Sequence, residues 1–100
     1  MGWFLLRLRP PRASFPADAT AAEGAAMDRH AAFWQARADA GDAAAVGPVL
    51  DPAGVWGLAI VQAADADAAL ALTRGDPVLT EVAGFSYEVL AMGGLIRPGG

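Results

Sequence analysis

The chain alternates strand-like and helix-like segments in an order that leaves few folds open to it. Residues 3–9 begin with an apolar run and then alternate apolar residues with arginine, as a mostly buried strand does. Pro10-Pro11 ends this strand, because proline has no amide hydrogen to donate to a sheet. Further strands are expected over residues 43–50, 55–62 and 85–90.

The first helix is marked by a capping signal. Thr20 and Glu23 have the spacing of a capping box, in which the hydroxyl accepts from the Glu23 amide and the carboxylate accepts from the Thr20 amide. The helix is expected to run to about residue 40, with Gly41 just after its end. A long helix between the first two strands follows from these signals.

The second helix is shorter and is followed by a turn. Asp65 is expected to cap residues 66–74, and Gly75-Asp76-Pro77 ends this helix and starts a short helical turn through residue 82. The full order is therefore βαββαβ, that of an α+β, ferredoxin-like domain with both helices on one face of an antiparallel sheet. The other sheet face needs a cover, which a second copy of the chain would supply.

Size and composition also favour self-association. One hundred residues make a single domain, and 55% of them are hydrophobic, more than a lone domain of this size needs to hide. We therefore expect a homodimer. The domain is expected over residues 1–92, with a flexible, Gly-rich tail over 93–100.

Several classes of function are disfavoured. The chain has no Cys, which excludes disulfides, thiolate metal sites and a Cys nucleophile. With one His and scattered carboxylates, we expect no metal site. The sequence contains no Gly-rich phosphate-binding loop, so we expect no nucleotide cofactor. A net charge of −4 argues against nucleic acid as a partner. No apolar run suits a signal peptide or a membrane span, so we expect a cytoplasmic protein.

His30 is the candidate proton carrier. It is the only His in the chain and shares a helix face with Met27 and Trp34, which directs it toward the sheet. An imidazole can give or take a proton near neutral pH. A carboxylate bound to one ring nitrogen would leave the other free to act as a base. The alternative is a core histidine bonded to a backbone carbonyl.

Asp76 is the candidate partner of this imidazole. Pro77 fixes the chain after it, and a helix N-terminus follows. The alternative is a simple N-cap, which is a common use of Asp. Both can hold, with one oxygen capping the helix while the other binds the imidazole.

Four further residues are candidates for substrate binding, each with a structural alternative. Gly47 and Pro48 could form a pocket rim or a β-bulge. Arg7 could bind an anionic group or lie on a solvated strand face. Ser86, or its neighbour Tyr87, could donate to a ligand, or both could serve sheet packing. The large aromatics Trp34 and Trp56 are expected in the core or a dimer contact.

The chain also resembles the YCII-related (YciI-like) family from Phe4 to Leu90. The residues that carry this resemblance, in order, are Met27-Asp28-Arg29-His30, Gly41, Gly47-Pro48, Ile60-Val61, Ala69-Leu70, Asp76-Pro77 and Tyr87-Glu88-Val89. The resemblance implies a ferredoxin-like fold, a homodimeric α+β barrel, and a His–Asp pair lining a cleft, here His30 and Asp76. One branch of the family is associated with dehydrochlorination of a chlorinated hydroxyquinol.

Two features depart from the family pattern. Val78 stands where an aromatic residue is frequent, which could reshape the cleft. The segment 9–22 is longer than in the shortest members and could add a flap. The leading hypothesis is a cofactor-independent lyase-like or isomerase-like enzyme in which His30 and Asp76 transfer a proton of a small molecule. The alternatives are a metabolite-binding or accessory dimer without catalysis and a purely structural dimer.

Overall fold

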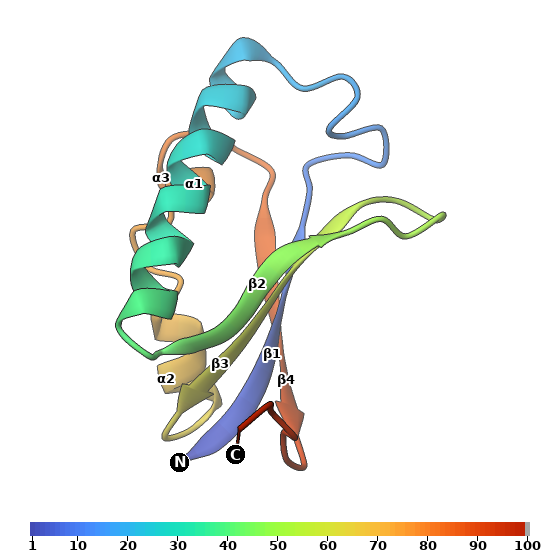
Figure 1. The fold of residues 1–100 in the computed structure, drawn as a ribbon. Helices are drawn as coiled ribbons and strands as arrows, with labels where there is room; N and C mark the ends of the chain where they lie inside the picture. The colour runs from blue at the N-terminus through green and yellow to red at the C-terminus, as the bar shows by residue number, and fades with distance from the viewer. Residues whose placement is uncertain (100) are drawn as a thin grey trace.

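A computed structural model describes residues 1–99 and shows a small α+β domain with a four-stranded sheet (Figure 1). The strands are paired in the order β2-β3-β1-β4, and every pair is antiparallel. The bounds are β1 Gly2–Arg9, α1 Ala21–Asp39, β2 Ala43–Val49, β3 Trp56–Ala63, α2 Ala66–Ala71, α3 Pro77–Thr80 and β4 Ser86–Met92. This is the ferredoxin-like arrangement that the order of segments predicts.

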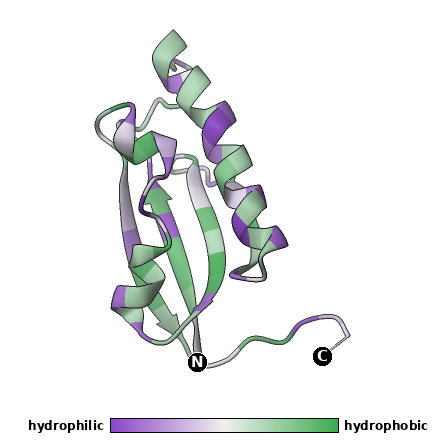
Figure 2. Cartoon of the chain, turned by 90° about the vertical axis from the view of Figure 1, so that its left-hand side faces the viewer, coloured by the Kyte–Doolittle hydropathy of each residue, from purple (hydrophilic) through white to green (hydrophobic). Residues whose placement is uncertain are grey.

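The two faces of the sheet differ because side chains alternate along each strand. On β1, Phe4, Leu6 and Leu8 are buried against the helices. Leu5 and Arg7 point to the opposite face, which no helix covers (Figure 1). Figure 2 shows apolar residues along the strands, between α1 and the segment that holds α2 and α3.

The capping box at the start of α1 is confirmed. Thr20 Oγ1 accepts from the Glu23 amide at 3.1 Å, and Glu23 Oε1 accepts from the Thr20 amide at 2.9 Å. The helix then runs for 19 residues, and Gly41 follows it with a φ of 86°. Trp34 is the largest fully buried side chain of this helix and packs in the core with Phe4 and Leu6.

The second helix ends earlier than residue 74. The α-helix stops at Ala71, and the Thr73 hydroxyl donates to the Leu70 carbonyl at 2.7 Å. That side-chain bond competes with the helical backbone pattern. Gly75 has a φ of 83° and turns the chain into α3, which ends at Thr80 rather than at residue 82.

A β-bulge at Gly47-Pro48, the structural alternative for this pair, is not present. Gly47 pairs with Leu58 and Pro48 pairs with Gly57 in continuous register. The irregularity of β2 lies between Ala43 and Ala45. Proline is tolerated here because β2 is an edge strand, one side of which has no neighbour to bond.

The C-terminal segment leaves the end of β4 (Figure 2). Its Arg97 guanidinium lies over the Trp3 ring, 4.7 Å from the centroid. Flexibility of residues 93–99 stays a prediction, and Gly100, which belongs to the same predicted tail, lies outside the described residues. Within residues 1–99, no helix is both long enough and apolar enough to cross a bilayer.

Candidate active site

The structure brings His30 and Asp76 into direct contact, although 46 positions separate them in the chain. His30 lies on α1, and Asp76 immediately precedes α3. The His30 Nδ1 atom is 2.9 Å from both Asp76 Oδ1 and Oδ2. An ionised carboxylate only accepts hydrogen bonds, so Nδ1 carries the proton of this contact.

The Asp76 carboxylate is fully buried and is surrounded by donors. Its Oδ1 accepts from the Val78 amide at 3.2 Å, which caps α3. Its Oδ2 accepts from Trp34 Nε1 at 3.2 Å and from the Tyr87 hydroxyl. Asp76 therefore serves as both helix cap and imidazole partner.

The charge state of Asp76 follows from two opposing effects. Burial raises the pKa of the Asp76 carboxyl, and the hydrogen bonds from His30 and Tyr87 lower it by more. The pKa of Asp76 therefore lies below its ordinary value. Burial and the neighbouring carboxylate together raise the pKa of Tyr87 far above its usual range, so Tyr87 remains a neutral donor at physiological pH.

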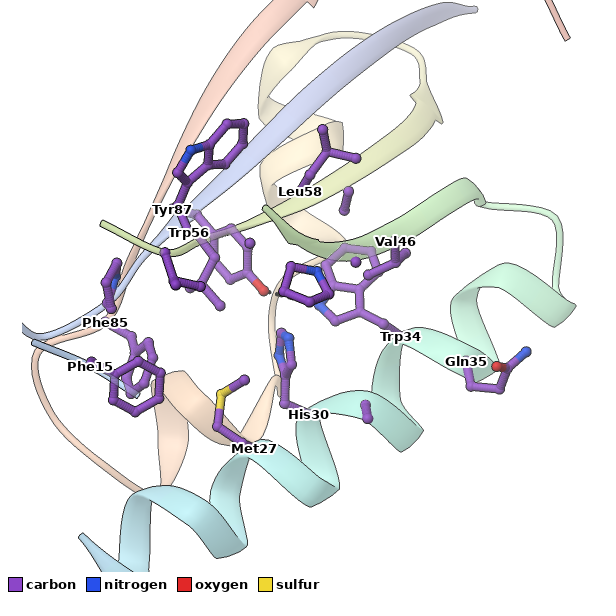
Figure 3. Close-up of a pocket in the computed structure, with 18 of the residues that line it drawn as sticks. Phe15, Met27, His30, Trp34, Gln35, Val46, Trp56, Leu58, Phe85 and Tyr87 are labelled. Carbon is purple, nitrogen blue, oxygen red and sulfur yellow. Dashed lines mark hydrogen bonds between the residues drawn. The ribbon is translucent and has the colours of Figure 1, made fainter. Parts of the chain in front are cut away.

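His30 faces a cavity of about 490 Å³ between α1, the β2–β3 edge and the loop before α1 (Figure 3). This volume lies within the range typical of small-molecule sites. Its walls are mainly apolar and aromatic, formed among others by Phe15, Met27, Trp34 and Phe85. Of the described residues that line the cavity, none is Arg, Lys, Asp or Glu.

The second imidazole nitrogen is placed to act on a molecule in this cavity. Nδ1 is engaged by Asp76, and the hydrogen bonds that the His30 ring makes within residues 1–99 are those of Nδ1. The His30 side chain is 13% exposed and its ring is directed toward the cavity (Figure 3). A neutral imidazole held this way presents the Nε2 lone pair to a ligand.

The loop at residues 10–19 forms one wall of the cavity. Phe15, which is buried, meets Phe85 edge-to-face with ring centroids 5.2 Å apart. Arg12 clamps the loop to α1 through a two-pronged ion pair with Glu23, at 2.7 and 2.9 Å. At Gly84, with a φ of 94°, a Cβ atom would lie 2.6 Å from Pro11, so any other residue would push the loop away.

The structure brings some of the sequence-predicted binding residues to this cavity and leaves others elsewhere. Gly47 and Pro48 line it. Ser86 and Arg7 are not among its lining residues; both point to the uncovered sheet face. The Arg7 guanidinium lies 4.6 Å from the centroid of the Trp56 ring.

Sequence reasoning missed the part that Trp34 and Tyr87 play at Asp76. Trp34 was expected only to pack, and it does pack in the core, but its indole nitrogen also donates to the carboxylate. Tyr87, rather than Ser86, faces the helices. Its position opposite Leu8 in the β1–β4 register sets this direction. Trp34 also follows His30 by one helical turn, which is a signal for a shared partner.

The described part of the chain holds no group of three or more His, Cys, Asp or Glu side chains that could bind a metal ion. Asp76, the carboxylate nearest His30, already accepts from three side chains and one backbone amide. An imidazole whose Nδ1 is bound to a carboxylate can give or take a proton at Nε2.

Comparison with known proteins agrees with this geometry at the level of the family. The model of the YCII-related domain matches residues 6–93, which include His30, Asp76 and all the strands except the start of β1. No curated protein gives a significant match. The chain belongs to the YCII-related domain family.

Proposed function

We propose that this protein is a cofactor-independent enzyme that moves a proton on a small molecule, with His30 as the base and Asp76 as the positioning residue. The observation that carries the proposal is the His30–Asp76 contact: one imidazole nitrogen is bound to a buried carboxylate, and the other faces an apolar cavity. Capping of α3 needs only one Asp76 oxygen, so the contact with the imidazole goes beyond that structural role, and a buried ionic group is costly to maintain.

The reaction follows from the protonation states of the pair. Neutral His30 takes a proton from a carbon or hydroxyl of the substrate at Nε2. The imidazolium that forms lies beside the Asp76 carboxylate, which balances its charge. The proton then returns to another atom of the substrate, as in an isomerase, or to a leaving group, as in a lyase. A positioned base of this kind contributes about 10²–10⁴-fold to the rate.

The dimer is the second part of the proposal. A second copy would cover the face of the sheet that no helix covers. Leu5 and Leu90 lie opposite each other on that face, and Leu90 is 49% exposed. An exposed apolar sheet face favours self-association. Sedimentation of the wild type should give a dimer, and Leu90→Lys should shift it toward the monomer; a wild-type monomer at all concentrations would refute this part.

The test of catalysis uses proton exchange, since no substrate is assigned. The protein is incubated in D₂O with a panel of small enols, phenols and β-dicarbonyl compounds, and deuterium incorporation is followed by NMR. We expect exchange on at least one compound, reduced about 10²–10⁴-fold in His30→Ala. The matched control is Asp28→Asn, an exposed residue two positions earlier on α1, which should keep full activity.

A metabolite-binding module without catalysis is the alternative that this experiment separates. It predicts ligand binding with no exchange above background in the wild type. Equal exchange by wild type and His30→Ala on the same compound would also refute the role of His30. Circular dichroism and sedimentation show whether each variant keeps its fold and its assembly.

A further inference from the structure

We propose that this cavity selects uncharged, largely apolar ligands whose single acidic group is directed at His30, and that it rejects carboxylates and ammonium ions of the same shape. The proposal rests on the proposed function for the site and adds the class of ligand that the site accepts. It derives from the charges in and around the cavity.

The wall of the cavity supplies no free charge. Among the described residues that line the cavity, only His30 has a side chain that can carry a positive charge. Its charge, when present, is already matched by Asp76 at 2.9 Å. An anionic ligand would therefore lose its hydration without gaining an unpaired cation, and transfer of an unpaired ion into apolar surroundings is strongly unfavourable.

Four arginines near the cavity are also engaged. Each forms an ion pair with a carboxylate: Arg9 with Glu88, Arg12 with Asp18 and Glu23, Arg29 with Glu81, and Arg37 with Asp42. Arg7 forms no ion pair among residues 1–99, and its buried Nε has no hydrogen-bond partner there. Its guanidinium lies over the Trp56 ring, on the sheet face away from the helices, and does not line the cavity. A cationic ligand cannot contact the nearest carboxylate either, since Asp76 is fully buried and is not among the residues that line the cavity.

The arrangement of the walls sets the direction of the ligand. Phe15 and Phe85 form an aromatic cluster on one side of His30, and Met27 lies between that cluster and the imidazole (Figure 3). Burial of apolar ligand surface against these side chains favours a flat or aromatic body under the loop. The acidic group of the ligand then meets Nε2.

Three probes of one shape test this selection: 1-naphthol, 1-naphthoate and 1-naphthylmethylammonium. Each is titrated into the protein at pH 7 and moderate salt. Its dissociation constant is read from the NMR shifts of the single His ring and the Trp34 indole, so that the site of binding is observed directly. We expect naphthol to bind at least tenfold more tightly than either ion, a difference of about 1.4 kcal/mol.

Variants of Phe15 test the apolar wall. Naphthol affinity should fall from wild type to Phe15→Leu and further to Phe15→Ala, whereas Ile96→Ala, a fully exposed control, should bind as the wild type does. The proposal is overturned if naphthoate or the ammonium probe binds as tightly as naphthol, if the shifts map to residues outside the cavity, or if no probe binds up to its solubility limit.

Failure of the proposed function gives a different result. If the wild type selects naphthol over both ions but exchanges no proton on any compound of the panel, the proposed ligand class is supported and the proposed catalytic role of His30 is refuted. If exchange depends on His30 but the preference among the three probes is absent, catalysis holds and the ligand class is wrong.

Discussion

Two buried carboxylates of this domain, Glu23 and Asp76, reach a similar state by different means. Both have a pKa below the ordinary value of their type. Glu23 lies at the start of α1, where the Arg12 guanidinium lowers its pKa to about 2. Asp76 has no arginine. Burial raises the pKa of Asp76, but hydrogen bonds from the His30 imidazole, the Tyr87 hydroxyl and the Val78 amide lower it by more.

The difference distinguishes the Glu23–Arg12 ion pair, which has a structural role, from the Asp76–His30 pair, which we propose takes part in the reaction. The negative charge of Glu23 is neutralised by the Arg12 guanidinium, and its carboxylate also accepts from the Thr20 amide in the capping box. The neutral donors around Asp76 stabilise its charge without cancelling it, so the full negative charge remains available to His30 as it gains a proton. The comparison thus predicts that the same chemical change at the two positions has different consequences.

The largest effect is expected on catalysis from amide substitutions at the two carboxylates. Asp76→Asn should reduce proton exchange by about 10²–10⁴-fold, because an amide can donate to Nδ1 and so leave the proton on Nε2, where the base is needed. Glu23→Gln should change the exchange rate by less than about twofold, since Glu23 does not contact His30. Equal losses in the two variants would remove the distinction between them.

The next effect is on stability, from the donors of Asp76. Tyr87→Phe removes the hydroxyl that donates to Oδ2. A hydrogen bond to a charged group contributes about 1.5–3 kcal/mol, so the free energy of unfolding in urea should fall by that amount. Because Tyr87 helps to stabilise the ionised form of Asp76, the pKa of Asp76 should rise in this variant. An unchanged stability would show that the hydroxyl does not support the carboxylate.

Loss of the capping box at Glu23 should lower the free energy of unfolding by less than loss of the Tyr87 hydroxyl. Thr20→Ala removes the hydroxyl that accepts from the Glu23 amide at 3.1 Å. Loss of an N-cap typically costs about 1 kcal/mol. Chemical denaturation should show this loss with proton exchange at the wild-type rate. A loss of proton exchange in this variant would contradict a purely structural role for the capping box.

The smallest effect is the acid dependence contributed by Glu23. Its pKa is lowered from 4.5 to about 2 in the folded protein. The unfolded chain therefore binds more protons in this interval, and the stability that Glu23 contributes is present above about pH 4.5 and is lost as the pH falls toward 2. Glu23→Gln should flatten the curve of unfolding free energy against pH in this window. A curve of unchanged slope would contradict the role of Arg12.

The fold could be predicted from the sequence because its signals are local. The capping box at Thr20 and Glu23, the turn glycine Gly41 and the alternation along β1 each depend on neighbouring residues. Pro48 misled because a proline in a strand indicates a bulge or an edge, and only the strand order shows that β2 is an edge.

The candidate site could be predicted only in part, because its contacts are distant in the chain. Pro77 and the expected helix N-terminus made Asp76 a candidate partner of His30, and the family resemblance supported the pair, since no spacing rule joins α1 to the start of α3. Trp34 and Tyr87 were missed as donors because large aromatics at core positions are explained by packing alone. The clamp of Arg12 on Glu23 depends on the path of the loop, which the sequence does not determine.

The tautomer of the single histidine tests the central claim most directly. In ¹⁵N-labelled protein, long-range ¹H–¹⁵N correlation of the neutral His30 ring distinguishes a proton on Nδ1 from one on Nε2. The structure predicts that the neutral ring carries its proton on Nδ1, toward Asp76, and that Asp76→Asn loses this preference. A wild-type ring with the proton on Nε2 would mean that Asp76 does not hold the imidazole as a base.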